Sequence, residues 1–104
     1  MVKAEDAKAI ALSLPGAGEQ PHFNRTAFTV RKKIFATISF EDNTLNLKFT
    51  PAEQFIFCPP ASDIIFAIPN GWGRQGWTTI NLNKASKKLV TAALNEAYKI
   101  RVAK

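Results

Sequence analysis

The sequence has little of the side-chain chemistry that catalytic and metal sites need. Its 104 residues include one cysteine, Cys58, and one histidine, His22. A lone cysteine cannot form an internal disulfide, which is typical of a reducing compartment, so we expect a cytoplasmic protein. No Cys or His pair has zinc-ligand spacing, and no acidic residue follows His22 at a spacing typical of a catalytic base. The sequence therefore predicts no metal, no cofactor and no catalytic residue, and an enzyme built on His22 ranks last among the functions considered.

Long hydrophobic runs are also absent. No apolar stretch reaches the roughly 20 residues that a membrane helix needs, and the first ten residues lack the apolar block of a signal peptide. We therefore expect no contact with a membrane. With 46% hydrophobic and 21% charged residues, the chain has the composition of a globular protein. Its length predicts a single domain over residues 1–104.

Acidic residues are scarce in the C-terminal part of the chain. Residues 1–63 balance their acidic and basic side chains, whereas residues 64–104 contain one acid, Glu96. The whole excess charge, +6 at pH 7, therefore lies in this second part. Such a balance favours an anionic partner, with nucleic acid first. A basic surface that serves only solubility is the other interpretation.

The spacing of apolar residues predicts two long helices and four strands. The i, i+3, i+4 repeat predicts helices over residues 4–14 and 85–102. Alternating apolar and polar residues predict strands over 26–30, 34–40, 45–49 and 77–82. In the second strand, the residues expected to face the core are Ile34, Ala36, Ile38 and Phe40.

The segments between these elements carry turn and capping signals. Residues 16–25 are expected to form a loop. Thr50, Pro51 and Glu53 predict the start of a helix, which Pro59 must end soon afterwards. Residues 58–76 are expected to be irregular, with an apolar edge segment over 64–67. Together these elements predict an α+β two-layer sandwich, in which an antiparallel sheet has the N- and C-terminal helices on one face.

Several short segments, in the right order along nearly the whole chain, resemble one known family. They are Leu14-Pro15-Gly16, 33–38, 45–48, 50–54, 76–80 and Glu96-Ala97-Tyr98. Each segment is short, but their order and spacing resemble the MmcQ/YjbR-like proteins. The resemblance implies a CyaY-like fold and DNA binding through a double wing of loops. It does not imply the iron chemistry of frataxin, which shares that fold, because the first helix offers only two carboxylates, Glu5 and Asp6.

Three groups of basic residues are the candidate nucleic-acid contacts. Arg31, Lys32 and Lys33 lie at a predicted hairpin tip, and Arg74 lies in the loop rich in proline and glycine. The third group, Lys84, Lys87 and Lys88, lies at the start of the last helix, where cations oppose the helix dipole. Side chains of this kind on two tips can grip phosphates on either side of a groove.

Trp72, between Gly71 and Gly73, supports the alternative function. The glycine spacing loosely follows a nucleotide-binding loop, but the segment leads into a strand rather than a helix, so we expect a simple connection. An exposed Trp72 favours a non-catalytic protein-interaction module or self-association, and stacking of unpaired bases on Trp72 or Phe35 is a further option. We expect a monomer or a weak homodimer.

Overall fold

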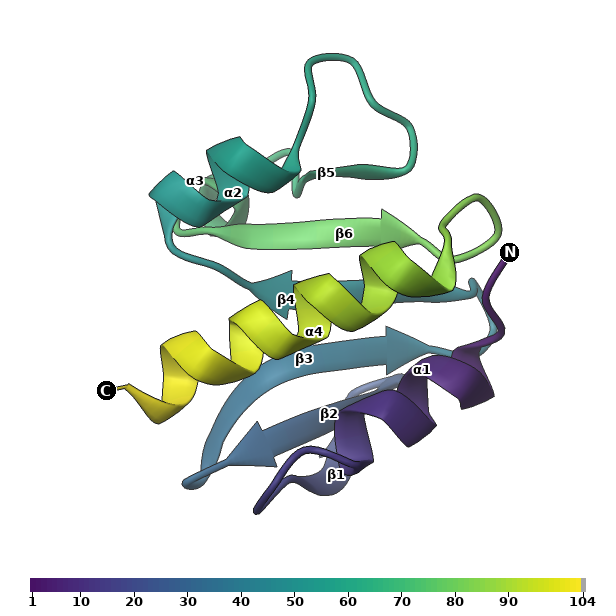
Figure 1. The fold of residues 1–104 in the computed structure, drawn as a ribbon, viewed down its shortest axis with the longest axis vertical. Helices are drawn as coiled ribbons and strands as arrows, with labels where there is room; N and C mark the ends of the chain where they lie inside the picture. Colours follow the sequence, from purple (N-terminus) through teal and green to yellow (C-terminus); the bar gives the residue numbers. More distant parts are fainter. Residues whose placement is uncertain (104) are drawn as a thin grey trace.

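The computed structural model describes residues 1–103, and it confirms the two-layer α+β sandwich (Figure 1). One antiparallel sheet has the strand order β1-β2-β3-β4-β6-β5. The strands are β1 (Gly18–His22), β2 (Arg25–Val30), β3 (Lys33–Ser39), β4 (Thr44–Lys48), β5 (Ile65–Ala67) and β6 (Trp77–Asn81). The helices are α1 (Ala4–Leu12), α2 (Pro51–Phe57), α3 (Gly71–Arg74) and α4 (Lys87–Val102).

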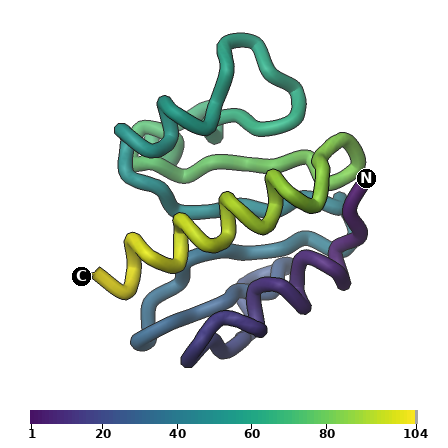
Figure 2. Tube along the Cα trace, viewed as in Figure 1, coloured from purple at the N-terminus to yellow at the C-terminus, as the bar shows by residue number. Residues whose placement is uncertain are grey.

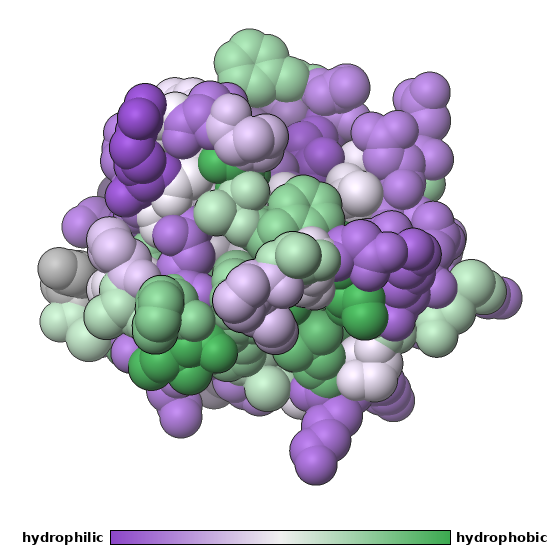
Figure 3. All heavy atoms as spheres, turned by 90° about the horizontal axis from the view of Figure 1, so that it is seen from above, coloured by the Kyte–Doolittle hydropathy of each residue, from purple (hydrophilic) through white to green (hydrophobic). Residues whose placement is uncertain are grey.

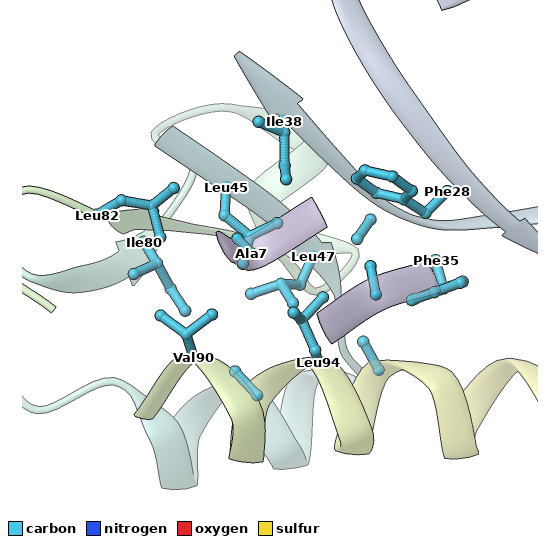
Figure 4. Packing of buried hydrophobic residues seen from close by; sticks show 14 of the residues in the cluster. Ala7, Phe28, Phe35, Ile38, Leu45, Leu47, Ile80, Leu82, Val90 and Leu94 are labelled. Carbon is cyan, nitrogen blue, oxygen red and sulfur yellow. The ribbon is translucent and has the colours of Figure 1, made fainter. Parts of the chain in front are cut away.

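Helices α1 and α4 cover the same face of the sheet (Figures 1 and 2). The core lies between them and the strands, where Leu47 and Ile80 meet Val90 and Leu94 of α4 (Figure 4). All four of these side chains are fully buried. In the part of the chain that the structure describes, no helix has the length and apolar character to cross a membrane. We call the other face of the sheet, which α1 and α4 leave uncovered, the open face.

The predicted capping signal at the start of α2 is confirmed, and α4 has a cap that was not predicted. The Thr50 hydroxyl accepts a hydrogen bond from the backbone N–H of Glu53 at 3.2 Å, and Pro51 is the first residue of α2. Ser86 caps α4 in the same way, through the N–H of Leu89 at 3.1 Å. These bonds satisfy backbone donors that the first turn of a helix leaves without partners.

The prediction for the facing of β3 is wrong at both ends of the strand. A β-bulge leaves Phe35 without a partner on β2, and the bulge exchanges the faces of Ile34 and Phe35. Phe35 is fully buried, with its ring 5.7 Å from that of Tyr98 on α4, whereas Ile34 is only partly buried. At the other end the strand stops at Ser39, and Phe40 is 43% exposed instead of facing the core.

Two segments expected to be irregular contain regular structure. Residues 18–22 form the edge strand β1, although they show no apolar alternation and include Pro21. An edge strand tolerates proline because one side of it needs no N–H donors. The expected apolar edge segment is confirmed as β5, and the connection that follows it folds into the short helix α3.

Candidate nucleic-acid interface

The turn between β2 and β3 exposes Arg31, Lys32 and Lys33. Val30 pairs with Lys33, so the turn consists of Arg31 and Lys32 alone, with φ angles of +52° and +67°. A turn with positive φ at both positions favours Asn-Gly, because the left-handed backbone brings Cβ close to the following carbonyl oxygen. Two long basic side chains therefore occupy a turn whose backbone conformation favours other residue types. Strain of this kind is common at functional sites.

The C-terminal end of α4 lies beside this turn. The Arg101 side chain donates a hydrogen bond from Nε to the carbonyl of Ile34 at 2.8 Å, and Lys99, two residues earlier, is exposed. These two cations were not among the predicted contacts, because basic residues are ordinary at the C-terminal end of a helix, where they complement its dipole. Only the tertiary structure identifies them, because the crossing of α4 over the sheet places the end of this helix at the hairpin (Figure 1).

Arg74 lies at the same end of the sheet. Ala36 pairs with Leu47, and Leu47 pairs with Thr78, so β3 and β6 both begin at the same end of the sheet. Arg74 ends α3, just before β6, and is exposed. Only β4 separates β3 from β6, which corresponds to about 10 Å at the usual strand spacing. We call the group at this edge the basic end: Arg31, Lys32, Lys33, Arg74, Lys99 and Arg101.

The remaining predicted contacts lie at the opposite edge. The chain leaves β6 at Asn81, and Lys84, Lys87 and Lys88 follow in the connection to α4 and in its first turn (Figure 1). Lys84 is bound to Asp63 at 2.5 Å, and this ammonium lowers the pKa of the Asp63 carboxyl. The structure thus divides the seven candidates between two ends of the molecule. Among the described residues, Lys84 alone of the seven has an ion-pair partner.

The open face holds a cavity of about 260 Å³. Thr37 and Asn46, from the central strands, form its floor. The turn between β1 and β2 lines one side, and the segment from Ile68 to Trp77 lines the other. The lining residues are His22, Phe23, Asn24, Arg25, Thr37, Asn46, Ile68, Trp72 and Trp77.

Arg25 brings a positive charge to this cavity. Its guanidinium donates to the Thr37 hydroxyl at 2.8 Å, to the Thr37 carbonyl at 3.1 Å, and to the hydroxyl and carbonyl oxygens of Thr44. Burial lowers the pKa of Arg25, and the Asp42 carboxylate opposes that effect. Arginine nevertheless stays protonated at neutral pH because its ordinary pKa is so high. Its partners are neutral oxygens, and the lining contains no carboxylate, so the cavity wall is positive.

Two aromatic side chains stand at the rim of the cavity. Phe23 is 95% exposed and has a φ of +58°, in a two-residue turn where glycine is favoured. Its ring contacts that of His22 edge-on, with centroids 4.9 Å apart. Trp72 is 59% exposed, as its position between two glycines led us to expect. Phe23 lies in the segment predicted as a loop, and its role was not predicted because a strained turn shows only in the backbone angles.

The sole thiol and the sole imidazole lie on different faces of the sheet. Cys58 packs against the core, where it interacts with Thr78, and burial raises the pKa of its thiol. His22 lines the cavity on the open face. The two therefore do not form a nucleophile–base pair, which requires hydrogen-bond distance. Within residues 1–103, no cluster of three or more His, Cys, Asp or Glu side chains could hold a metal ion.

Comparison with known proteins agrees with this architecture. The crystal structure of the Deinococcus radiodurans protein DR2400, with domain DUF419, is similar with a TM-score of 0.80 and 20% sequence identity; the match covers 96% of this chain and 78% of that one. At this identity the likeness concerns the fold. No curated protein matches the sequence. The YjbR family model matches residues 12–100, which includes the whole sheet and most of α4. The chain belongs to the YjbR family.

Proposed function

We propose that this protein binds DNA, or a comparable polyanion, through the phosphates that the basic end contacts. The observation that carries the proposal is the turn of Arg31 and Lys32, where two exposed cations occupy left-handed backbone positions. Arg74, Lys99 and Arg101 extend the positive charge along the same edge. Such contacts give affinity rather than sequence recognition. The protein would act in the cytoplasm as a monomer or a weak homodimer, without catalysis.

The basic end and the lysines near the start of α4 lie far apart, so the proposal assigns the contacts to one of these two groups. Lys87 and Lys88 lie at the other edge of the sheet, so a duplex seated on the basic end does not need them. Lys84 is further committed to Asp63. We therefore assign the phosphate contacts to the basic end, and we treat the lysines at the start of α4 as an internal control with the same charge.

Fluorescence anisotropy with a labelled 20-base-pair duplex at low salt tests the proposal. The double variant Arg31→Glu/Lys32→Glu should weaken binding at least tenfold, because it removes two phosphate contacts and adds repulsion. The matched variant Lys87→Glu/Lys88→Glu changes the net charge equally and should lose far less affinity. No binding of the unaltered protein at low salt, or equal loss in both variants, would overturn the assignment.

A second candidate, a protein-interaction module, has one observation in its favour. Besides Trp72, the side chains of Phe55 and Ile56 on α2 are 84% and 72% exposed. Seen from above, over α2 and the loop that follows it, apolar and hydrophilic side chains interleave (Figure 3). Single exposed apolar residues are common on monomeric proteins. We therefore rank this function second, and binding that depends on Phe55 but not on the basic end would favour it.

A further inference from the structure

We propose that the cavity on the open face holds one unpaired base of a nucleic-acid strand, so that the preferred ligand is single-stranded or locally unpaired. This inference rests on the function proposed above and names its substrate more closely. The cavity, at about 260 Å³, lies just below the volumes of about 300–1,000 Å³ that drug-sized ligands occupy. It therefore fits one small planar ring system rather than an extended ligand.

The walls of the cavity are suited to stacking. Trp72 and Trp77 stand on one side, and His22 and Phe23 stand on the other, above a floor of short polar side chains. Aromatic side chains next to positive charge are the usual platform for single-stranded nucleic acid, because every base offers a π-face. The exposed, strained Phe23 extends this platform at the rim. Its side chain is not buried in the protein, so core packing does not explain an aromatic residue at this position.

Asn46 and Arg25 bring free hydrogen-bond donors to the cavity, and these donors favour a ring with acceptor atoms. Asn46 accepts a hydrogen bond from the Thr79 hydroxyl at 2.8 Å through Oδ1, while its amide nitrogen donates no hydrogen bond within residues 1–103 and is not a buried atom. Arg25 retains one N–H on Nη1 beyond the bonds that it makes to Thr37 and Thr44. The carbonyl edge of a pyrimidine matches these donors.

The same groups disfavour other occupants. A cationic ligand, the usual guest of an aromatic cage, would meet the charge of Arg25 with no carboxylate in the lining. A phenylalanine or tryptophan side chain of a protein partner would bury the Asn46 amide and the Arg25 N–H without offering acceptors, which is unfavourable. A base satisfies the aromatic and the polar groups together.

Two cations lie close to the tryptophans of the cavity along the chain or across the sheet. Arg74 follows Trp72 by two residues on α3, and Lys48 pairs in register with Trp77. The Lys48 ammonium donates to the carbonyls of Phe49 and Gln75, which fixes a positive charge at this edge. The phosphates flanking an inserted base would therefore lie near Lys48 and near Arg74, which is one of the cations of the basic end.

Intrinsic fluorescence gives a direct test, because both tryptophans of the chain line the cavity. Two strands of equal length are compared, oligothymidine and an abasic strand that has the same backbone without bases. Oligothymidine should quench the tryptophan emission and bind more tightly than the abasic strand and than a duplex. Trp72→Ala should weaken oligothymidine binding about 5- to 100-fold and leave abasic binding unchanged. Phe55→Ala, a distant exposed aromatic, should change neither.

A second variant addresses the polar part of the site. Asn46→Asp keeps the acceptor for Thr79 but replaces the free donor by a carboxylate, so it should reduce oligothymidine binding more than abasic binding at an unchanged melting temperature. Equal affinity for the two strands, with unaltered tryptophan emission, would overturn the inference and leave the proposed function standing. No binding of any strand or duplex at low salt would overturn both. Tighter binding of N-acetylphenylalaninamide than of thymidine monophosphate would assign the cavity to a protein side chain.

Discussion

Three residues with positive φ angles, Phe23, Arg31 and Lys32, stand at turns where the sequence could have used Gly or Asn. A left-handed backbone is unfavourable for an L-residue with a bulky side chain by about 1–2 kcal/mol. Each of the three is exposed, so core packing does not compensate. At the residue scale, the candidate site thus contains three positions where local stability conflicts with the side chain that is present.

Replacing the hairpin turn should separate stability from binding. The variant Arg31→Asn/Lys32→Gly gives the turn the residues that its backbone favours, so the free energy of unfolding should rise by about 1 kcal/mol. DNA affinity should fall, because two phosphate contacts are lost. Thermal unfolding should move upward by about 4–8 °C per kcal/mol. A lower melting temperature would show that the turn is not strained, and unchanged affinity would show that it is not a contact.

Sequence reasoning found the charges of the turn but not its backbone. Arg31, Lys32 and Lys33 were predicted from composition at a polar break between two strands. Phe23 was missed because its neighbours carry no distinctive pattern, and its strain comes from the pairing of His22 with Arg25. Such a pairing depends on long-range sheet formation, which local periodicity does not report.

At the scale of elements, α3 positions the tryptophans. A Cβ on Gly73 would lie 1.7 Å from the Ile68 carbonyl oxygen, and a Cβ on Gly76 would lie 1.8 Å from that of Phe49. Both clashes involve backbone atoms, so relief requires movement of the segment that carries Trp72 and Trp77. These two glycines allow the wall of the cavity to pack against the residues that directly follow β5 and β4.

A matched pair of glycine substitutions tests this role. Gly73→Ala should lower the free energy of unfolding by more than about 2 kcal/mol, since overpacking against backbone costs about 1–3 kcal/mol or more. Gly71→Ala, where an added Cβ meets nothing within 4 Å, should be neutral or slightly stabilising. Urea denaturation of both variants measures the difference. Equal effects would mean that Gly73 is not closely packed.

The bulge in β3 makes a second prediction at this scale. Phe35→Ala should destabilise the protein by about 3–5 kcal/mol, because a fully buried aromatic leaves a cavity beside Tyr98. Ile34→Ala should cost about 1 kcal/mol, as its side chain is only partly buried. The strict alternation in the sequence predicts the opposite order. Chemical denaturation decides between the two, and a larger loss for Ile34→Ala would contradict the bulge.

The first turn of α4 offers a third prediction. Lys87 and Lys88 are exposed at the N-terminus of the helix, where cations are unfavourable. Changing both to Glu should raise the free energy of unfolding by about 0.3–1 kcal/mol for each residue at low salt. Thermal unfolding at two salt concentrations checks this, since the gain should shrink as salt screens the charges. A loss of stability would indicate an interaction of these lysines that the dipole argument does not include.

The long elements were predictable because their patterns are regular. The strands β4 and β6 bury every second residue, and α4 buries Val90, Ala93, Leu94 and Ala97, so these elements follow the periods of 2 and 3.6 that the sequence displays. The edge strand β1 was missed because its residues, GEQPH, are mostly exposed and polar. The bulge could not be predicted, because the apolar alternation of the sequence continues through it. Only the pairing of β3 with β2 shows that Phe35 is an extra residue.

At the scale of the whole molecule, the charge is arranged in space differently from its order along the chain. The excess lies in residues 64–104, yet α4 carries its Lys87 end and its Arg101 end to opposite edges of the sheet (Figure 1). The tip of Arg31 and Lys32, from the neutral part of the sequence, joins the Arg101 end. Composition predicts that cations are available, and only the crossing of α4 over the sheet decides which of them act together.

The dependence of DNA affinity on salt tests the account most directly. For the unaltered protein, a plot of log affinity against log salt should have a slope of about −3 to −5, since each phosphate contact contributes about −0.9. Arg31→Glu/Lys32→Glu should make that slope shallower by about 2, whereas Lys87→Glu/Lys88→Glu should leave it nearly unchanged. A slope that both variants flatten equally, or that the α4 variant alone flattens, would contradict the assignment of DNA binding to the basic end.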